Sequence, residues 1–194
     1  MQWLLSLFAG IGLSATCGFR IFLPMLGMSI ACKLGHLESA PGFGWMGSWP
    51  AILVLSLATV VEIVAYYIPY VDNLLDTIAT PAAFIAGTVV TGALLGGDLS
   101  PVIRWSFALI AGGGAATTIQ AGTTMLRGGS TVTTGGAANP IVSTLELIAS
   151  IIFTIVSIVL PVIAMLIFIG FIYMIYRMFT KKKKQKRKYG HLKA

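Results

Sequence analysis

Charge is scarce in this sequence. Only 10% of its 194 residues are Asp, Glu, Lys or Arg, whereas soluble domains carry about 25%. Hydrophobic residues make up 57%, and the mean hydropathy is +0.91. A soluble fold of this length has too little interior to bury so much apolar surface, so lipid must replace water around most of it. The sequence therefore predicts an integral membrane protein.

The sequence also lacks the residue groups on which most enzymes and metalloproteins depend. Two cysteines, Cys17 and Cys32, are too few for a disulfide framework, and with two histidines they show no metal-ligand spacing. No nucleophile, base and orienting group form a recognisable set. Gly10-Ile11-Gly12 begins a dinucleotide-binding spacing, but it lies inside an apolar stretch and follows no strand. We expect no enzymatic activity, no cofactor and no metal.

The basic residues are concentrated at one end of the chain. Nine of the thirteen Lys and Arg lie between Arg177 and Lys193, while residues 1–176 hold four basic and six acidic residues. A nucleic-acid-binding protein would spread its basic residues over a folded face, so we expect no nucleic acid partner. We predict a transmembrane domain over residues 1–178 and a disordered basic tail over 179–194. The positive-inside rule makes this tail cytoplasmic, where it would attract anionic lipid headgroups.

Five segments reach the roughly 20 apolar residues that a membrane span needs. They are Trp3–Ala31, Pro50–Ile68, the stretch between Asp76 and Asp98, the stretch between Arg104 and Arg127, and Pro140–Met178. The predicted fold is therefore an all-α, polytopic membrane protein of about five transmembrane helices. The fifth segment is longer than one span requires. Pro161 is expected to kink it, and two separate helices remain the alternative.

Two pairs of similar stretches predict an internal repeat. Residues 9–16 and 111–118 are both runs of small residues, and Pro50 and Pro140 each begin an apolar segment with one glutamate. The two units begin three predicted spans apart, so they would lie in opposite orientations. Inverted repeats with interrupted helices are typical of secondary transporters. Chance likeness between helices rich in small residues is the other explanation.

Small residues are also spaced for close contact between helices. Ala83, Gly87 and Thr91 recur every four residues, which predicts a face that packs closely against another helix. The stretch from Gly112 to Pro140 is rich in glycine and threonine. It is either a packed helix followed by a flexible loop over 127–139, or non-helical backbone beside a polar cavity.

Several polar residues lie in or beside the apolar segments. A charge at the bilayer centre costs at least ~2.5 kcal/mol, so such a residue faces a partner or water. Asp72 and Asp76 would share a helix face and repel each other unless a cation, a proton or an arginine lies between them. The predicted site consists of Arg20, Glu62, Asp72, Asp76, Arg127, Asn139 and Glu146. It is an Arg–carboxylate network that holds helices together, a site for an ion, a proton or an anionic headgroup, or both.

Three motifs carry a resemblance to a known family. They are Glu62-x-x-x-Tyr66-Tyr67-Ile68-Pro69-x-Val71-Asp72-x-x-x-Asp76, Gly18-Phe19-Arg20-x-Phe22-Leu23-Pro24 and Asn139-Pro140-x-x-Ser143-x-x-Glu146. In these motifs the chain resembles the bacterial membrane family catalogued as domain of unknown function 4126, over most of residues 10–150. It departs from that pattern at Tyr66-Tyr67, where the family has an Asp-Lys pair, and at Thr118 and Gln120, where a His or Lys is common. The resemblance implies a bacterial inner membrane protein and supplies no activity.

The two interpretations of the polar site lead to two functional hypotheses. In the first, the protein is a small transporter, channel or lipid-translocating protein, and a carboxylate alternates between protonated and charged forms as a small solute or ion passes. In the second, it is a membrane scaffold or assembly factor whose buried charges are structural. The sequence identifies no substrate and leaves assembly into a homo-oligomer open.

Overall fold

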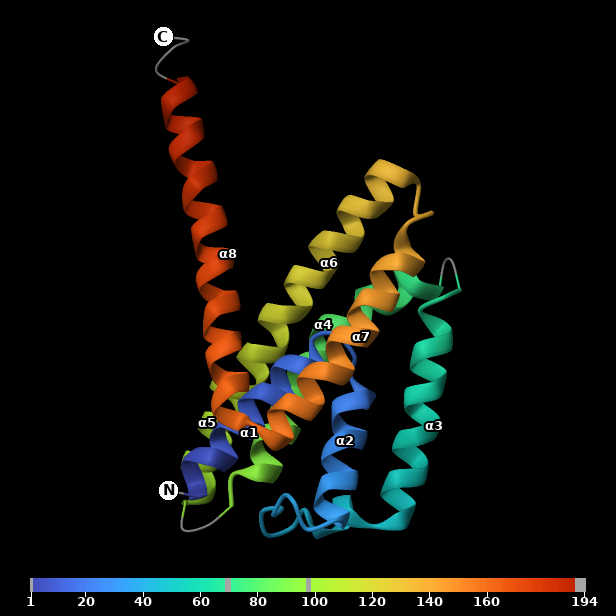
Figure 1. The fold of residues 1–194 in the computed structure, drawn as a ribbon, viewed down its shortest axis with the longest axis vertical. Helices are drawn as coiled ribbons and strands as arrows, with labels where there is room; N and C mark the ends of the chain where they lie inside the picture. Colours follow the sequence, from blue (N-terminus) through green and yellow to red (C-terminus); the bar gives the residue numbers. More distant parts are fainter. Residues whose placement is uncertain (1, 69–70, 97–98, 191–194) are drawn as a thin grey trace.

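The computed structural model describes residues 2–68, 71–96 and 99–190, and within them the chain is helical with no strand. This confirms the all-α prediction. The elements are α1 (Gln2–Cys17), α2 (Phe22–Lys33), the 3-10 turn η1 (Gly44–Gly47), α3 (Trp49–Ala65), α4 (Val71–Leu94), α5 (Pro101–Phe107), the wide π turn η2 (Ala108–Gly113), α6 (Gly114–Thr134), α7 (Asn139–Val159) and α8 (Pro161–Gly190). The long helices run alternately up and down, so α1 starts and α8 ends at opposite ends of the molecule (Figure 1).

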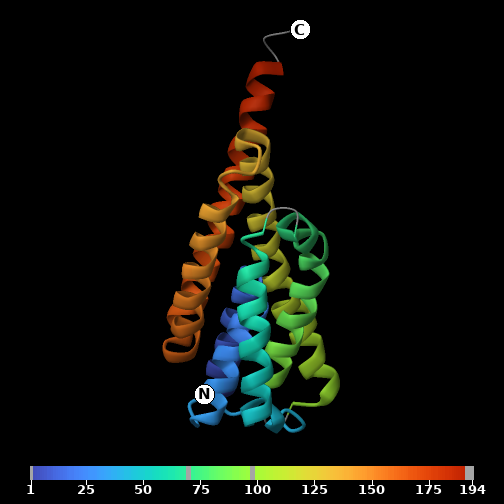
Figure 2. The ribbon, with the colours of Figure 1, turned by 90° about the vertical axis from the view of Figure 1, so that its right-hand side faces the viewer.

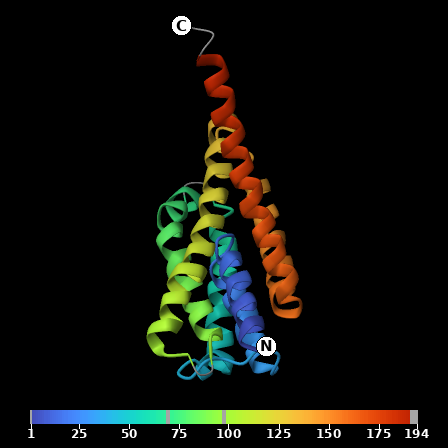
Figure 3. The same ribbon diagram turned by 90° about the vertical axis from the view of Figure 1, so that its left-hand side faces the viewer.

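In the part of the chain that the structure describes, three helical stretches are long and apolar enough to cross a membrane, as judged by length and composition. They are Leu74–Leu94, Pro101–Thr134 and Asn139–Val159. Four shorter apolar helices accompany them, namely Trp3–Cys17, Phe22–Lys33, Trp49–Ala65 and Pro161–Met174. Figures 2 and 3 show α6 and α8 extending beyond the other helices at one end. These helices support a membrane protein, but they divide the apolar residues differently from the five predicted segments.

The polarity of α7 is the reverse of that of a helix on a soluble protein. All of its buried residues are polar, namely Asn139, Ser143, Glu146, Ser150, Thr154 and Ser157. Its outer side is aliphatic, with Ile141 and Leu145 exposed by 64% and 62%. A helix that turns its polar side inward and its apolar side outward is suited to lipid as the outer solvent.

The first predicted segment is a hairpin of two helices, so the prediction of one span over Trp3–Ala31 is wrong. α1 and α2 lie antiparallel, and the connection 18–21 between them is largely buried (Figure 1). The backbone N–H groups of Gly18, Phe19 and Arg20 close the end of α1 by donating to the carbonyls of Ala15 and Thr16. The chain can therefore leave the helix inside the protein without unpaired backbone at the turn.

The fifth predicted segment is also two helices, so the two-helix alternative is confirmed and the single kinked helix is wrong. Leu160, with φ −133° and ψ 64°, ends α7, and α8 returns antiparallel to it (Figure 1). Pro161 begins α8, where a missing N–H costs nothing because the first turn has no intrahelical acceptor. α8 continues to Gly190, past the predicted boundary at 178. Residues 191–194 of the predicted tail lie outside the described residues.

The stretch rich in glycine and threonine is helical. α6 continues to Thr134, and hydroxyls such as those of Thr117 and Thr118 donate to carbonyls four residues earlier. The packed helix is thus confirmed, while the expected loop from 127 and the expected non-helical backbone are wrong. The turn into α7 is short because Gly135 and Gly136 take positive φ values of 64° and 88°, which other residues rarely adopt.

The predicted close-packing face of α4 is confirmed. On the side of α1, the Ser14 hydroxyl donates to the Gly87 carbonyl at 2.6 Å and lies 2.8 Å from the Thr91 hydroxyl. On the side of η2, Gly87 lies against Gly112, where a side chain on either residue would meet the other's backbone. Small residues thus let α1, α4 and η2 approach closely, as helices in lipid do.

The inverted relation expected of the repeat is not seen in both pairs of stretches. α1, with residues 9–16, runs in the same direction as η2 and α6, with residues 111–118 (Figure 1). By contrast, α3 and α7 run in opposite directions. One symmetry operation does not relate both pairs.

We predict that Gly87→Ala destabilises the protein, whereas Gly114→Ala does not. A Cβ at Gly87 would lie 2.6 Å from the Gly112 carbonyl oxygen, while a Cβ at Gly114 would have no neighbour within 4 Å. Overpacking of this kind costs about 1–3 kcal/mol, and a free helical Gly→Ala change gains roughly 0.5–1 kcal/mol. Unfolding in mixed micelles would measure both, and equal shifts for the two variants would contradict the close packing.

Candidate functional site

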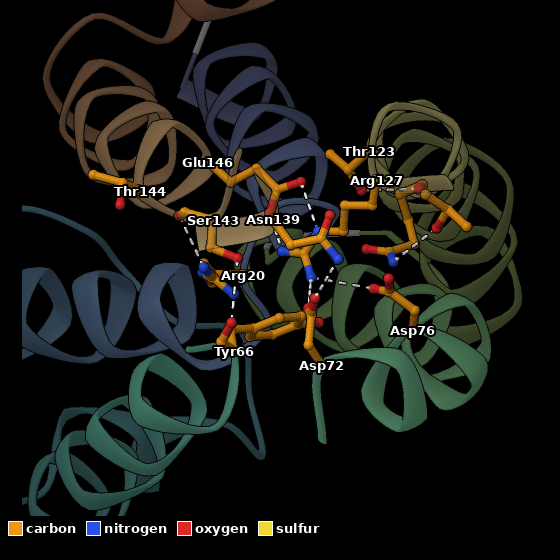
Figure 4. A network of polar contacts seen from close by, with 12 residues as sticks. Arg20, Tyr66, Asp72, Asp76, Thr123, Arg127, Asn139, Ser143, Thr144 and Glu146 are labelled. Carbon is orange, nitrogen blue, oxygen red and sulfur yellow. Dashed lines mark hydrogen bonds and ion pairs between the residues drawn. The ribbon is translucent and has the colours of Figure 1, made fainter. Parts of the chain in front are cut away.

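Arg127 is the centre of the polar site. It lies in α6, is 3% exposed and faces carboxylates from two other helices (Figure 4). Its Nε donates to Glu146 Oε1 at 3.1 Å and its Nη2 donates to Glu146 Oε2. The two residues therefore form a bidentate ion pair that joins α6 to α7. Its Nη1 donates to Asp72 Oδ1 and, at 3.4 Å, to Asp76 Oδ1 on α4. One guanidinium therefore joins α4, α6 and α7.

Asn139 closes the network at the start of α7. Its Nδ2 donates to Asp72 Oδ2 at 3.1 Å and lies 3.2 Å from the Thr131 hydroxyl of α6. The short turn at Gly135 and Gly136 places α7 beside α6, so that Asn139 and Arg127 reach the same carboxylate. Arg127 therefore offsets the repulsion expected between Asp72 and Asp76. The sequence analysis predicted a cation, a proton or an arginine at this position, and the structure has the arginine.

Arg20 lies in the buried connection between α1 and α2. Its Nη2 donates to the Ser143 carbonyl at 2.9 Å, and its guanidinium carbon is 4.0 Å from the centre of the Tyr66 ring. The guanidinium carbon of Arg127 lies 4.2 Å from the same ring centre. Among the described residues, Arg20 has no ion pair with a carboxylate, and its Nε and Nη1 have no hydrogen-bond partner. Two cations therefore share one aromatic ring, and one of them lacks a counter-ion in contact.

Glu62 is bound by backbone rather than by an arginine. Its Oε1 accepts from the N–H of Ile21 at 2.7 Å and its Oε2 from the N–H of Phe22 at 3.0 Å. The carboxylate therefore caps the N-terminus of α2 from α3, where the helix dipole favours a negative charge.

All seven predicted residues belong to one polar region. Arg20 and Arg127 both lie against the Tyr66 ring, and Asp72, Asp76, Glu146 and Asn139 are joined to Arg127 directly or through Asp72. Glu62 adjoins them through the N–H groups of Ile21 and Phe22, which follow Arg20. The Arg–carboxylate network exists around Arg127, but Arg20 and Glu62 lie outside it. The predicted set of site residues did not include Tyr66 or the buried hydroxyls of α7. The three-and-four spacing of polar residues from 139 to 157 was the signal that could have revealed these hydroxyls.

The charges of the region do not balance. Two arginines, Arg20 and Arg127, face four carboxylates, those of Glu62, Asp72, Asp76 and Glu146, so the formal charge is −2 if all are ionised. Asp76 has the longest contact with Arg127 and the most exposed side chain of its three partners, at 16%. The described residues contain no group of three His, Cys, Asp or Glu side chains placed to hold a metal ion.

We predict that Arg127→Met destabilises the protein by about 3–5 kcal/mol, because the change leaves three facing carboxylates without a counter-ion. The further changes Asp72→Asn and Glu146→Gln should restore part of that loss. Arg104→Met is the matched control, since Arg104 contacts the rings of Phe43 and Trp105 and forms none of the described ion pairs. Unfolding in mixed micelles gives all four values. Equal losses for the two single variants would show that the network adds no stability.

Comparison with known proteins places this chain in a family. The model of the family described as domain of unknown function (DUF4126) matches residues 7–181, which is most of the chain. No curated protein and no solved structure matched the chain. The motifs that carried the resemblance hold the residues that the fold brings together around Tyr66. The chain belongs to the DUF4126 family.

Proposed function

We propose that this protein is a small transporter, channel or lipid-translocating protein of the bacterial inner membrane, with a cytoplasmic C-terminus and no enzymatic step. The observation that carries the proposal is the surplus of carboxylates around Arg127. A buried ion pair that only holds helices together needs one acid for each base, because every extra buried charge is costly. Here three carboxylates share one arginine.

This surplus allows a proton to come and go without leaving the arginine unpaired. If Asp76, the most exposed of the three carboxylates, is protonated, Arg127 keeps its contacts with Asp72 and Glu146. Proton exchange at a buried site is the step that couples a proton gradient to the movement of a solute.

The position of the network supports the same proposal. Arg127, Asp76 and Glu146 lie on three different helices, so a change of charge alters how α4, α6 and α7 are held together (Figure 4). Helices held by a few switchable ion pairs can take more than one arrangement. The basic residues at the end of α8 would rest on anionic headgroups of the cytoplasmic leaflet. A second copy of the chain is a further proposed partner.

A membrane scaffold or assembly factor is the second candidate. It is favoured by Glu62 and Glu146, whose carboxylate oxygens all accept hydrogen bonds within the protein. Both oxygens of Glu146 accept from Arg127, and both oxygens of Glu62 accept from backbone N–H groups. In a scaffold these charges would hold helices together, and no solute would cross.

Flux measured in proteoliposomes tests the proposal. Vesicles loaded with a pH-sensitive dye would receive small organic anions, organic cations or sugars, and a fluorescent phospholipid would report lipid translocation. We expect one class to move together with protons in the wild-type protein, and Asp76→Asn to abolish the proton movement while the protein stays folded.

Glu38→Gln is the control, because Glu38 is an exposed acid far from the network in sequence. Proton-coupled flux that is the same in Asp76→Asn and wild type would remove the coupling role. If no class crosses the membrane and Asp76→Asn only lowers stability, the scaffold becomes the better description.

A further inference from the structure

The N-terminus of α2 binds a carboxylate, and that carboxylate belongs to Glu62 of the same chain. α2 begins after Ile21, which provides no side-chain cap. Its first N–H groups bind instead the two oxygens of Glu62, a residue of α3 that is 40 or more positions away in the sequence. The start of this 12-residue helix therefore binds a carboxylate by both oxygens, at 2.7 and 3.0 Å.

The Arg20 guanidinium, a second group able to bind an anion, precedes the start of this helix in the chain. Arg20 immediately precedes Ile21, is 1% exposed, and has two nitrogens, Nε and Nη1, with no partner. Its guanidinium contacts the ring of Tyr66, which follows Glu62 by four residues, and its charge acts on the Glu62 carboxylate. Buried charged donors without an acceptor are costly and rare, and they call for a specific explanation.

We propose that the start of α2 and the Arg20 guanidinium together bind the carboxylate of a small solute or of a lipid, and that Glu62 yields its position to this ligand by taking up a proton. The inference rests on the proposed function and names the substrate class. The charge balance is closed: one proton neutralises Glu62 while one anion enters. The ligand accepts from the N–H groups of Ile21 and Phe22 and from the two free nitrogens of Arg20.

The surroundings of Glu62 fit this exchange. The groups that face it include Arg20 and Cys17 from the α1–α2 hairpin, Arg127 from α6, and Tyr66 from its own helix. Arg127 is already paired with carboxylates, so the attraction for an anion after Glu62 has lost its charge comes from Arg20 and from the backbone N–H groups of Ile21 and Phe22.

The site also lies close to the outer surface. Glu62 is 8% exposed, whereas its neighbours Phe22 and Tyr67 are 36% and 39% exposed. The Tyr67 hydroxyl lies 2.9 Å from that of Thr144, so the turn that follows α3 contacts α7 through an exposed polar contact.

Calorimetric titration with sodium acetate tests the site in full-length protein held in phosphatidylcholine nanodiscs. Titrations in two buffers of different ionisation enthalpy would report proton uptake, and we expect about one proton per acetate. Arg20→Met should weaken binding by about tenfold or more, since charged hydrogen bonds are lost. Glu62→Gln should bind acetate more tightly and without proton uptake, because no internal anion competes. Glu38→Gln should behave as wild type.

Replacing phosphatidylcholine by phosphatidylserine distinguishes the two sources of the carboxylate. Weaker acetate binding in that lipid would identify a headgroup as competitor, and unchanged binding would identify a free solute. Either result supports the site.

Other outcomes would overturn the inference. They are the absence of acetate binding to wild type, binding without proton uptake, or binding that Arg20→Met leaves intact. The wild-type titrations alone decide the matter if Glu62→Gln does not fold. Acetate binding at this site without flux of any solute or lipid would retain the site and reject the transporter. Flux with no binding here would do the reverse.

Discussion

Lipid offers no hydrogen bonds, so the polar groups of this protein are placed in its interior, where other polar groups of the protein are the available partners. This constraint explains why α7 turns its polar side inward and why Arg127 gathers carboxylates from two neighbouring helices. The same constraint explains how α2 can begin inside the protein, next to α1 and α3. The free N–H groups at the start of α2 are satisfied by Glu62, so the hairpin can turn inside the protein. The polar contacts are therefore part of the fold as well as part of the site.

Tyr66 and Ser143 connect the two halves of the polar region. The Tyr66 ring lies against both guanidiniums, and its carbonyl is 3.4 Å from the Ser143 hydroxyl. The carbonyl of Ser143 in turn accepts from Arg20. A change in the Arg127 network can therefore reach Arg20 through one ring and one turn of α7. This contiguity gives the ion-pair network and the start of α2 a physical means of affecting each other.

The features of this structure that depend on short stretches of sequence could be predicted from hydropathy and charge. The apolar segments, the close-packing face around Gly87 and the set of buried charges all follow from local pattern. The two hairpins do not. The turn at residues 18–21 depends on Glu62, some 40 residues away. The turn at Leu160 contains no glycine, and Pro161 beside it fits a single kinked helix as well as a break between two helices. The pairing of Arg127 with Asp72, Asp76 and Glu146 could not be predicted either. The sequence shows which residues are charged, but it does not show which helices pack together.

The two arginines differ in a way that separates a structural role from a functional one. Arg127 has more acceptors than it needs, whereas Arg20, equally buried, has two nitrogens with none. A network selected only to hold helices together would move one carboxylate from the first to the second, because that would lower the energy of both. The structure instead binds Glu62 to the backbone N–H groups of Ile21 and Phe22, the two residues that follow Arg20. An excess of acids in one place and of donors in the next is what a site needs if it is to exchange protons and admit an anion.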